Sequence, residues 1–241
     1  MTSQLATNVA AIEQRIAAAA ARAGRDAAEV RLLPVSKTKP PADILAVREL
    51  GYRRFGENKV QEAQSKAEEL ADTDIEWAVI GHLQTNKARF VAQFASEFQA
   101  LSSLKVAAEL DKRLQAEGRR LEVLVQVNSS DEPQKYGLPP DEVLAFTREL
   151  SAFDALDVRG LMTLALFTDD QARIRACFEV MQQVQRELRD ADGGGWDELS
   201  MGMSGDFELA IEHGATCVRV GQAIFGSRLD PNAYWPGAAP R

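Results

Sequence analysis

Residues 30–58, VRLLPVSKTKPPADILAVRELGYRRFGEN, combine two short apolar runs with one helical segment between them. The run Val30–Lys37 predicts a strand, Pro41–Leu50 predicts a helix, and Arg53–Asn58 predicts a second strand. A strand, a helix and a strand joined by short connections form a unit whose two strands lie parallel in one sheet. This stretch therefore predicts an α/β fold, and its rhythm continues along the sequence.

The same alternation gives eight strands in all. The six further strands are predicted at Trp77–Gly81, Phe98–Ser102, Leu121–Asn128, Val158–Leu164, Glu198–Met201 and Cys217–Gly221. The remaining helices are predicted at Lys59–Leu70, Asn86–Phe94, Leu104–Glu117, Pro140–Ala152, Asp170–Asp190 and Gly205–His213. Eight such units usually close into a barrel. We therefore predict a single-domain (β/α)8 TIM-like barrel with an extra N-terminal helix over residues 4–23, and an open doubly wound sheet remains the structural alternative.

The composition fits one domain that does not bind nucleic acid. The chain has 241 residues, of which 45% are hydrophobic, and α/β barrels commonly form one domain at about this length. We assign residues 1–229 to the barrel and residues 230–241 to a C-terminal tail. A net charge of −8 and a pI of about 5.0 argue against a general binder of the phosphate backbone.

Cysteine usage and hydropathy bear on the compartment. The two cysteines, Cys177 and Cys217, lie far apart and form no CxxC motif, which indicates a reducing compartment rather than a disulfide framework or a metal site. The N-terminus lacks a basic-then-apolar signal pattern, and no stretch approaches the roughly 20 apolar residues of a membrane span. We expect a cytoplasmic monomer with no metal, no membrane partner and no nucleic-acid partner.

Lys37 is the first candidate for chemistry. It ends the run Leu32-Leu33-Pro34-Val35-Ser36-Lys37, and the period of two places Leu33, Val35 and Lys37 on one face of the strand. A lysine at the mouth of an apolar inward face is costly, because burial disfavours its charged form. The lowered pKa that results is what a Schiff-base lysine needs. A lysine that extends past the strand end into solvent is an equally good interpretation of the pattern alone.

Two loops near the other end of the chain carry residues that suit a phosphate group. Ser204 follows the seventh predicted strand and occupies an N-cap position, where it either caps the helix or offers its hydroxyl to a phosphate. After the eighth strand, Gly221 and Gln222 open a predicted short helical turn, and their N–H groups would point along its positive end. Phosphate sites in barrels commonly lie on the loops after strands seven and eight.

Two more polar residues end strands at the same face. Arg219 lies two positions before Gly221 and therefore shares its inward face, where it forms either a buried ion pair or a contact to a ligand. Asn58 ends the second strand and is either a hydrogen-bond donor to a ligand or the N-cap of the next helix. No metal-ligand cluster and no Ser/His/Asp grouping is visible, so we assign no catalytic residue.

Taken together, these segments resemble the pyridoxal phosphate homeostasis protein family, whose barrel is similar to the N-terminal domain of alanine racemase. The matching pieces lie between positions 35 and 226, in family order: Val35–Pro40, Phe55–Asn58 with Val60–Glu62, Ile80–Gln84 with Asn86-Lys87, Arg159–Met162, Met201–Ser204 and Val218–Gly226. The resemblance implies pyridoxal 5′-phosphate (PLP) as the cofactor. One departure is Ala78, where the family usually has a histidine; another is Gln222, where relatives often have threonine.

The resemblance also implies roles for individual residues. Lys37 carries PLP as a Schiff base, and Arg219 faces the pyridine nitrogen. Ser204 grips the phosphate together with the backbone N–H groups of Gly221 and Gln222. Asn58 is then a wall or hydrogen-bond residue of the pocket.

The implied function is a PLP-binding carrier that buffers the cofactor and supplies apo-enzymes without robust catalysis of its own. The first alternative is a PLP-dependent amino-acid racemase-like enzyme, and the second is a Schiff-base lyase without PLP. Racemases of the similar fold take a second base from an additional C-terminal domain, which we do not expect here. Guanidinium offers only donors, so Arg219 leaves the pyridine nitrogen unprotonated and makes the ring a poor electron sink. Lys135, after the fifth strand, is predicted on the same face, as a transient acceptor of the aldehyde or as a solvated surface lysine.

Overall fold

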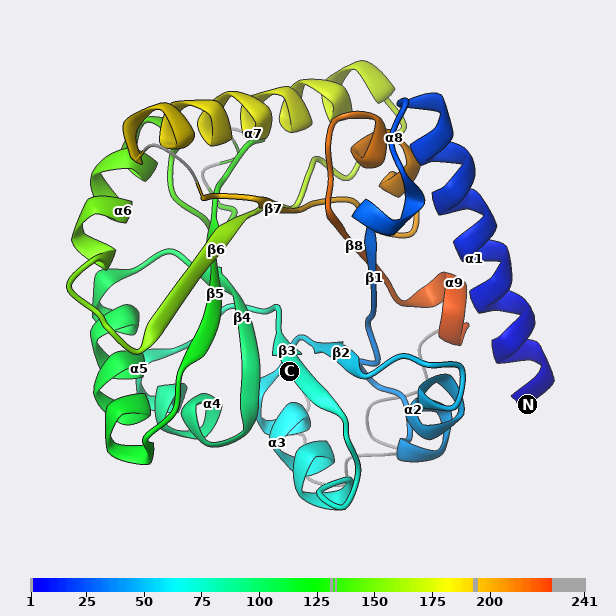
Figure 1. The fold of residues 1–241 in the computed structure, drawn as a ribbon, viewed down its shortest axis with the longest axis horizontal. Coiled ribbons are helices and arrows are strands. Elements are labelled where there is room, and N and C mark those ends of the chain that lie inside the picture. Colours follow the sequence, from blue (N-terminus) through cyan, green and yellow to red (C-terminus); the bar gives the residue numbers. More distant parts are fainter. Residues whose placement is uncertain (1, 131, 133, 193–194, 227–241) are drawn as a thin grey trace.

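The eight predicted strands all form, and they close into one ring (Figure 1). The computed structural model describes residues 2–130, 132, 134–192 and 195–226. The strands are β1 (Arg31–Pro34), β2 (Arg54–Glu57), β3 (Glu76–Val79), β4 (Ala95–Leu101), β5 (Leu121–Gln126), β6 (Leu156–Met162), β7 (Glu198–Ser200) and β8 (Cys217–Val220). They pair in parallel in the order β1-β8-β7-β6-β5-β4-β3-β2. The predicted barrel is correct, and the open sheet is excluded.

The ring closes between β1 and β2 through a single isolated bridge. Val35, just past β1, pairs in parallel with Gly56, and the Ser36 N–H donates to the Gly56 carbonyl at 3.0 Å. Along β1 and just past it, the backbone N–H groups of odd-numbered residues point toward β8. The Val35 N–H, for example, donates to the Val220 carbonyl at 2.9 Å. Pro34 has no N–H, so it donates no hydrogen bond to β2. The missing donor contributes to the sparse pairing at this junction.

Helices surround the ring. They are α1 (Thr2–Arg22), α2 (Pro41–Arg48), α3 (Val60–Glu69), α4 (Ala88–Phe94), α5 (Leu104–Glu117), α6 (Val143–Leu150), α7 (Gln171–Asp192), α8 (Phe207–Glu212) and α9 (Gln222–Phe225), with short 3₁₀ helices η1 (Ala27–Glu29), η2 (Thr85–Lys87) and η3 (Pro140–Glu142). Helix α5 has its predicted bounds, because its buried residues recur at helical spacing and Gly118 ends it with φ of 62°. The extra N-terminal helix is α1, which buries Val9, Ile12 and Ile16 and packs against α8 and α9.

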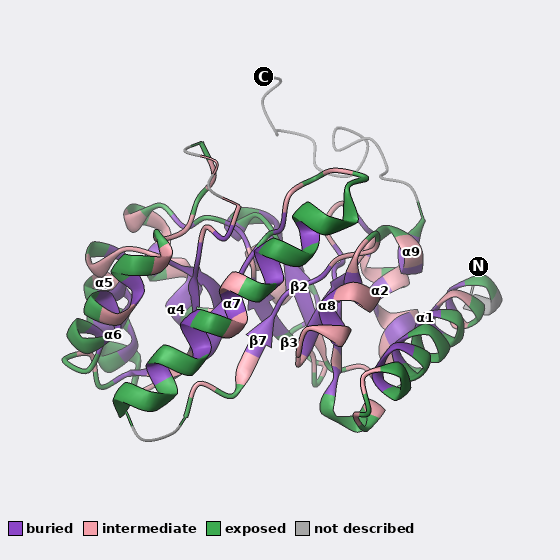
Figure 2. Cartoon of the chain, turned by 90° about the horizontal axis from the view of Figure 1, so that it is seen from above, coloured by how far each residue is buried: buried purple, intermediate pink, exposed green. Residues whose placement is uncertain are grey.

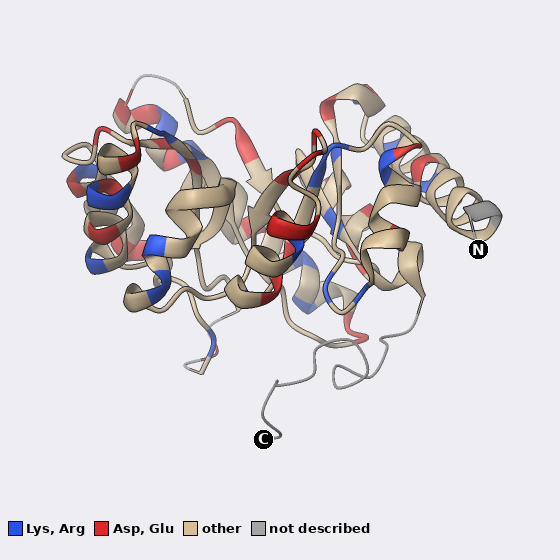
Figure 3. Cartoon of the chain, turned by 90° about the horizontal axis from the view of Figure 1, so that it is seen from below, with Lys and Arg blue, Asp and Glu red and all other residues tan. Residues whose placement is uncertain are grey.

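Burial separates the molecule into a buried ring of strands and half-exposed helices (Figure 2). Basic and acidic residues are interspersed on the outer helices (Figure 3), which is typical of a solvated surface. None of the described helices combines the length and the apolar character that a membrane crossing requires. The proposed tail, residues 230–241, lies outside the described residues, as do positions 227–229 of the predicted barrel domain.

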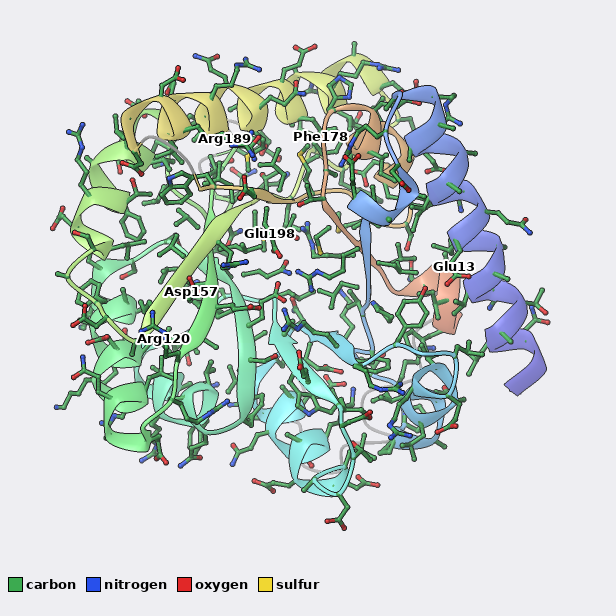
Figure 4. The ribbon with its side chains drawn as sticks, viewed as in Figure 1. Glu13, Arg120, Asp157, Phe178, Arg189 and Glu198 are labelled. Atoms are coloured by element: carbon green, nitrogen blue, oxygen red, sulfur yellow. The ribbon has the colours of Figure 1, made fainter. Side chains whose placement is uncertain are left out.

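The amino-terminal end of the barrel is filled by charged side chains rather than by a purely apolar core. Glu97 on β4 is 1% exposed and pairs with Arg31 at 3.0 Å and with Arg54 at 2.7 Å. Arg31 also pairs with Glu198 at 3.2 Å, and Arg54 pairs with Glu122 at 2.7 Å. Glu198 is labelled in Figure 4, near the middle of the ring of strands. This network ties strands β1, β2, β4, β5 and β7 together at one end, so the opposite end is left for a site.

Candidate functional site

Lys37 lies in the loop after β1, at the carboxyl end of the barrel, and is half-buried. Its loop meets the loop after β8, because Gly221 packs directly on β1: a Cβ at Gly221 would lie 3.0 Å from the Val35 carbonyl oxygen. It also meets the end of β2 through the bridge between Val35 and Gly56. The predicted position of Lys37 at the barrel mouth is therefore correct.

Lys39 is the nearest competing lysine in the same loop, and it is engaged elsewhere. It is 5% exposed, and its Nζ donates to the carbonyl of Phe225 in α9 at 2.8 Å. Burial lowers the pKa of the Lys39 ammonium. Lys39 therefore ties the β1 loop to α9, whereas Lys37 lies nearer to solvent.

Arg219 points into the barrel from β8 and is 3% exposed. Its Nη1 donates to the Ser200 hydroxyl at 2.6 Å, and its Nη2 donates to the Thr163 carbonyl at 2.6 Å. Burial lowers the pKa of its guanidinium, although the Asp206 carboxyl nearby acts in the opposite direction. The sequence left a buried ion pair open for Arg219, but its closest contacts are neutral oxygen atoms that hold the plane of the group in place.

A chain of polar side chains behind Arg219 was missed by the sequence analysis. The Ser200 hydroxyl donates to Gln99 Oε1 at 2.7 Å, and Gln99 Nε2 donates to the carboxylate of Glu97. Ser200 and Gln99 are both fully buried. The signal was present in the sequence, because Glu97 and Gln99 share one face of β4 and polar residues on an inward face need partners. Arg219 is thus connected to the charged network at the far end of the barrel.

Ser204 lies in the turn between β7 and α8, and it is not the N-cap that the sequence predicted. Helix α8 begins at Phe207, and its N-cap is Asp206. The Asp206 carboxylate reaches back and accepts the Met203 N–H at 2.6 Å, so this carboxylate organises the turn. Burial raises the pKa of Asp206. Among the described residues nothing accepts the N–H groups of Ser204 and Gly205.

The loop after β8 presents a second set of unused donors. Gly221 is the N-cap of α9, and Gln222 is the first residue of that helix. Within the described part of the chain, the N–H groups of Gly221 and Gln222 have no acceptor, as expected for the first turn of a helix. Strands β7 and β8 are paired neighbours, so both sets of donors end the same part of the barrel. These donors suit an anionic group such as a phosphate.

Asn58 follows β2 and lines a cavity at the barrel mouth. The alternative prediction, that Asn58 is the N-cap of the next helix, is wrong, because the N-cap of α3 is Lys59. The Asn58 carbonyl lies tightly against Gly81, where a Cβ would be 2.0 Å from the carbonyl oxygen. The cavity has a volume of about 490 Å³ and is lined by Asn58, Lys59, Val60, Gln61, Ile80, Gly81, His82, Gln84, Lys87, Gln126, Tyr136 and Leu164. Lys37, Arg219 and the two donor loops do not line it.

An aromatic pair forms one wall of this cavity. His82, after β3, stacks on Tyr136 from the loop after β5, with ring centroids 4.0 Å apart and an interplanar angle of 11°. Gln126 fixes this loop by donating its Nε2 to the Tyr136 carbonyl at 3.1 Å. Lys135, beside it, pairs with Glu132 and donates to the Ala165 carbonyl at 3.2 Å. Lys135 lies on the predicted face, held by Glu132 of its own loop and by the loop after β6.

The structure therefore brings five of the six candidate residues to three neighbouring strands. Lys37 lies in the loop after β1, Arg219 and the Gly221-Gln222 pair belong to β8 and its loop, and Ser204 follows β7. Asn58, the sixth, follows β2 on the other side of Lys37. An amine, a fixed guanidinium and free N–H groups form a donor set that fits an aldehyde with a ring acceptor and a phosphate. PLP has these three groups, so the residues fit the cofactor that the resemblance implies.

Comparisons with known proteins identify the family of this barrel. The family model "Alanine racemase, N-terminal domain" matches residues 7–229. The pyridoxal phosphate homeostasis protein of Pseudomonas aeruginosa is 41% identical over 226 residues, covering 94% of this chain and 96% of that protein. The same-named protein of Escherichia coli K12 is 38% identical and covers 94% of this chain and 97% of its own length.

Solved structures show the same barrel fold. PipY of Synechococcus elongatus PCC7942, determined with PLP bound, superposes with a TM-score of 0.77 at 36% identity, over 82% of this chain and 93% of PipY. Alanine racemase of Clostridium difficile 630 shares the fold at 14% identity, with a TM-score of 0.74 over 95% of this chain and 57% of the racemase. The chain belongs to the pyridoxal phosphate homeostasis protein family, with a barrel of the alanine racemase N-terminal type.

Proposed function

We propose that this chain binds PLP through Lys37 as a Schiff base and maintains its supply, buffering the free cofactor and passing it to apo-enzymes. The observation that carries the proposal is the position of Lys37 at the barrel mouth, on the strand next to Arg219 and the two donor loops. When bound, PLP supplies an electrophilic aldehyde and an anionic phosphate. The PLP-bound PipY structure and the named relatives support this function.

We assign the roles of the residues from their contacts. Ser204 and the N–H groups of Gly221 and Gln222 hold the phosphate, because these donors lack an acceptor in the described chain. Arg219 faces the pyridine nitrogen, and its bonds to Ser200 and Thr163 keep the guanidinium from turning away. Asn58 forms the wall toward the cavity. None of these residues is assigned a catalytic role.

The carrier function is favoured over an amino-acid enzyme by the chemistry of Arg219. A guanidinium has donors only, so the ring nitrogen that it faces stays unprotonated and the ring withdraws electrons poorly. The relatives are named homeostasis proteins rather than enzymes. The racemase-like alternative rests on the fold shared with alanine racemase.

The open cavity at the barrel mouth, lined by Asn58, suits the release of cofactor to a partner. Its described lining includes Lys59, Lys87 and His82, and none of the described lining residues carries a carboxylate, so these residues do not repel an anionic molecule at the mouth despite the net charge of −8. Lys135 as a transient acceptor stays a prediction, as do the recipient apo-enzymes, the monomeric state and the cytoplasmic location.

One experiment tests the proposal directly. Borohydride reduction of the PLP-loaded protein, followed by peptide mass spectrometry, should place one pyridoxyl-phosphate group on Lys37. The loaded protein should then reactivate a PLP-free apo-enzyme faster than release of free PLP explains, and leave a panel of L-amino acids unchanged. No adduct on Lys37, or steady multiple turnover of any amino acid, contradicts the proposal, and turnover favours the racemase-like alternative.

A further inference from the structure

Four buried polar residues lie between the barrel wall and α3, outside the site described above. Ser36, Glu57 and Lys66 are fully buried, and Glu62 is 8% exposed. Lys66 Nζ donates to Glu57 Oε1 at 2.6 Å and to Glu62 Oε1 at 2.8 Å. The Ser36 hydroxyl donates to the same Glu57 oxygen at 2.6 Å. A charged lysine is rarely buried this deeply without a function or an exceptional need of the fold.

This cluster forms hydrogen bonds with the backbone on both sides of Lys37. On one side, Lys66 Nζ donates to the Ser36 carbonyl at 2.8 Å. On the other, the Thr38 N–H donates to the Glu62 carboxylate. Lys66 and Glu62 are one turn apart on α3, so a single helical turn holds the two peptide groups that flank Lys37.

These hydrogen bonds are needed because the backbone of the loop has an unusual conformation at Thr38. Thr38 has φ of 64°, a left-handed conformation that β-branched residues rarely adopt. Such a conformation persists only where the surroundings hold it. On the β2 side, the loop also has just one bridge, between Val35 and Gly56. The hydrogen bonds of Lys66 and Glu62 therefore hold the loop in place, where strand pairing on the β2 side holds it by one bridge.

The charges in the cluster do not balance if both acids are ionised. One ammonium faces two carboxyl groups, and Glu57 Oε2 is buried without a hydrogen-bond partner in the described chain. Burial raises the pKa of Glu57 more than the Lys66 ammonium lowers it. Glu57 is thus the member that tolerates loss of its charge, whereas Lys66 and Glu62 hold the loop.

We propose that Lys66, with Glu62, is a positioning residue that fixes the Lys37 loop so that the Lys37 amine meets the cofactor aldehyde. This inference rests on the proposed Schiff base at Lys37. Lys66 does not touch the cofactor, and it acts through the two peptide groups beside Lys37. A merely structural cluster would change stability but would not distinguish a ligand that bonds to Lys37 from one that does not.

The test compares PLP with pyridoxine 5′-phosphate, which carries an alcohol in place of the aldehyde and keeps the ring and phosphate. The variant is Lys66→Met combined with Glu57→Gln, because Lys66→Met alone leaves buried carboxylates without their cation. Lys105→Met, at an exposed position on another helix, is the matched control. Circular dichroism and thermal unfolding establish that each variant is folded before binding is measured.

The expected result is a selective loss. In the double variant the Kd for PLP rises about tenfold or more, because small misplacements of a reacting group have effects of this size. The rate at which the borohydride-reducible adduct forms on Lys37 falls alongside. The Kd for pyridoxine 5′-phosphate changes less than about twofold, and Lys105→Met changes neither ligand. Glu62→Gln, which keeps an oxygen for the Thr38 N–H, should show an intermediate loss for PLP only.

Other outcomes overturn the inference. Equal weakening of both ligands means that the cluster only maintains the pocket. Unchanged binding of both, in a folded variant, means that Lys66 does not position the loop. If the double variant does not fold, Glu62→Gln decides, and a selective loss of PLP in that variant is required. If the wild-type protein forms no adduct on Lys37, the proposed function and this inference are both refuted. That failure is distinguishable from failure of the inference alone, because it is seen in the wild type before any variant is made.

Discussion

Replacing Glu97 by glutamine should destabilise the protein strongly, because this carboxylate is the buried centre of the charged network. The Glu97 side chain is 1% exposed, and its two partners, Arg31 and Arg54, are 29% and 24% exposed. The substituted amide would keep the shape and one acceptor oxygen but would remove the charge that both guanidinium groups share. The structure therefore predicts a loss of stability rather than a local rearrangement at the surface.

The magnitude follows from the burial of the pair. Removing one partner of a buried ion pair costs about 3–5 kcal/mol. Arg31 retains Glu198 and Arg54 retains Glu122, and both arginines are partly solvated, so the lower end, about 3 kcal/mol, is expected. For a chain of this length, that loss corresponds to a fall in Tm of roughly 6–12 °C.

The effect should depend on pH with a definite sign. Burial alone would raise the pKa of Glu97, but the Arg31 and Arg54 guanidinium groups outweigh burial and hold that pKa below its ordinary value. The contribution is therefore complete above the unfolded pKa of about 4.3 and is lost as pH falls through the lower folded value. The difference between wild type and Glu97→Gln should be full at pH 7 and should shrink in acid.

Urea unfolding at pH 7 and at pH 4, followed by circular dichroism, measures both quantities. Asp157→Asn is the control, because Asp157 pairs with Arg159 at 3.6 Å with both side chains about half exposed; its cost should stay within about 0.5 kcal/mol. Equal destabilisation by the two substitutions, or a Glu97→Gln effect that grows in acid, would refute the account of the network.

Three further predictions concern the site. Lys37→Ala should fold as the wild type does but lose the visible absorbance of bound PLP; a retained band in the folded variant would move the linkage to another lysine. Pyridoxal without the phosphate should bind at least about 100-fold more weakly than PLP in equilibrium titrations, because charge-assisted bonds to the free N–H groups contribute about 1.5–3 kcal/mol each, and similar Kd values would show that the donor loops do not hold the phosphate. Gly81→Ala should lower stability by about 1–3 kcal/mol in thermal unfolding, since its Cβ would lie 2.0 Å from the Asn58 carbonyl oxygen, whereas Gly205→Ala, with nothing within 4 Å, should change it little; equal effects would contradict the steric argument.

The strand pattern was predictable because each parallel strand is a short apolar run bounded by turns. All eight strands were predicted in order, with errors of a few residues at their ends. The run Val30–Lys37 was extended too far, since pairing stops at Pro34 and only the Val35 bridge follows. Pattern alone does not reveal where a partner strand ends.

The site was predictable where a residue ends a strand and was missed where partners are distant in sequence. Lys37 and Arg219 follow from period-two alternation and from the ends of β1 and β8. Lys66 was missed because its position on α3 looks like that of any helical lysine, and only the packing of α3 on the barrel brings it to the Ser36 carbonyl. The N-cap role of Ser204 failed because Asp206, two residues later, occupies the cap.

The single bridge between β1 and β2 has a consequence for motion. At this junction Pro34 donates no hydrogen bond, and the described pairing is reduced to Val35 and Gly56, whereas neighbours such as β5 and β6 share a ladder of six residue pairs; the β7–β8 junction is also short, with Ser200 and Cys217 as its registered pair. Local opening of a native protein begins where few backbone hydrogen bonds must break. The barrel should therefore open more readily along the β1–β2 junction than along a long ladder such as β5–β6, and the β1–β2 junction leads to the Lys37 loop. Opening at this junction would expose the Lys37 loop to a partner molecule, while the ladder that joins β1 to β8 stays paired.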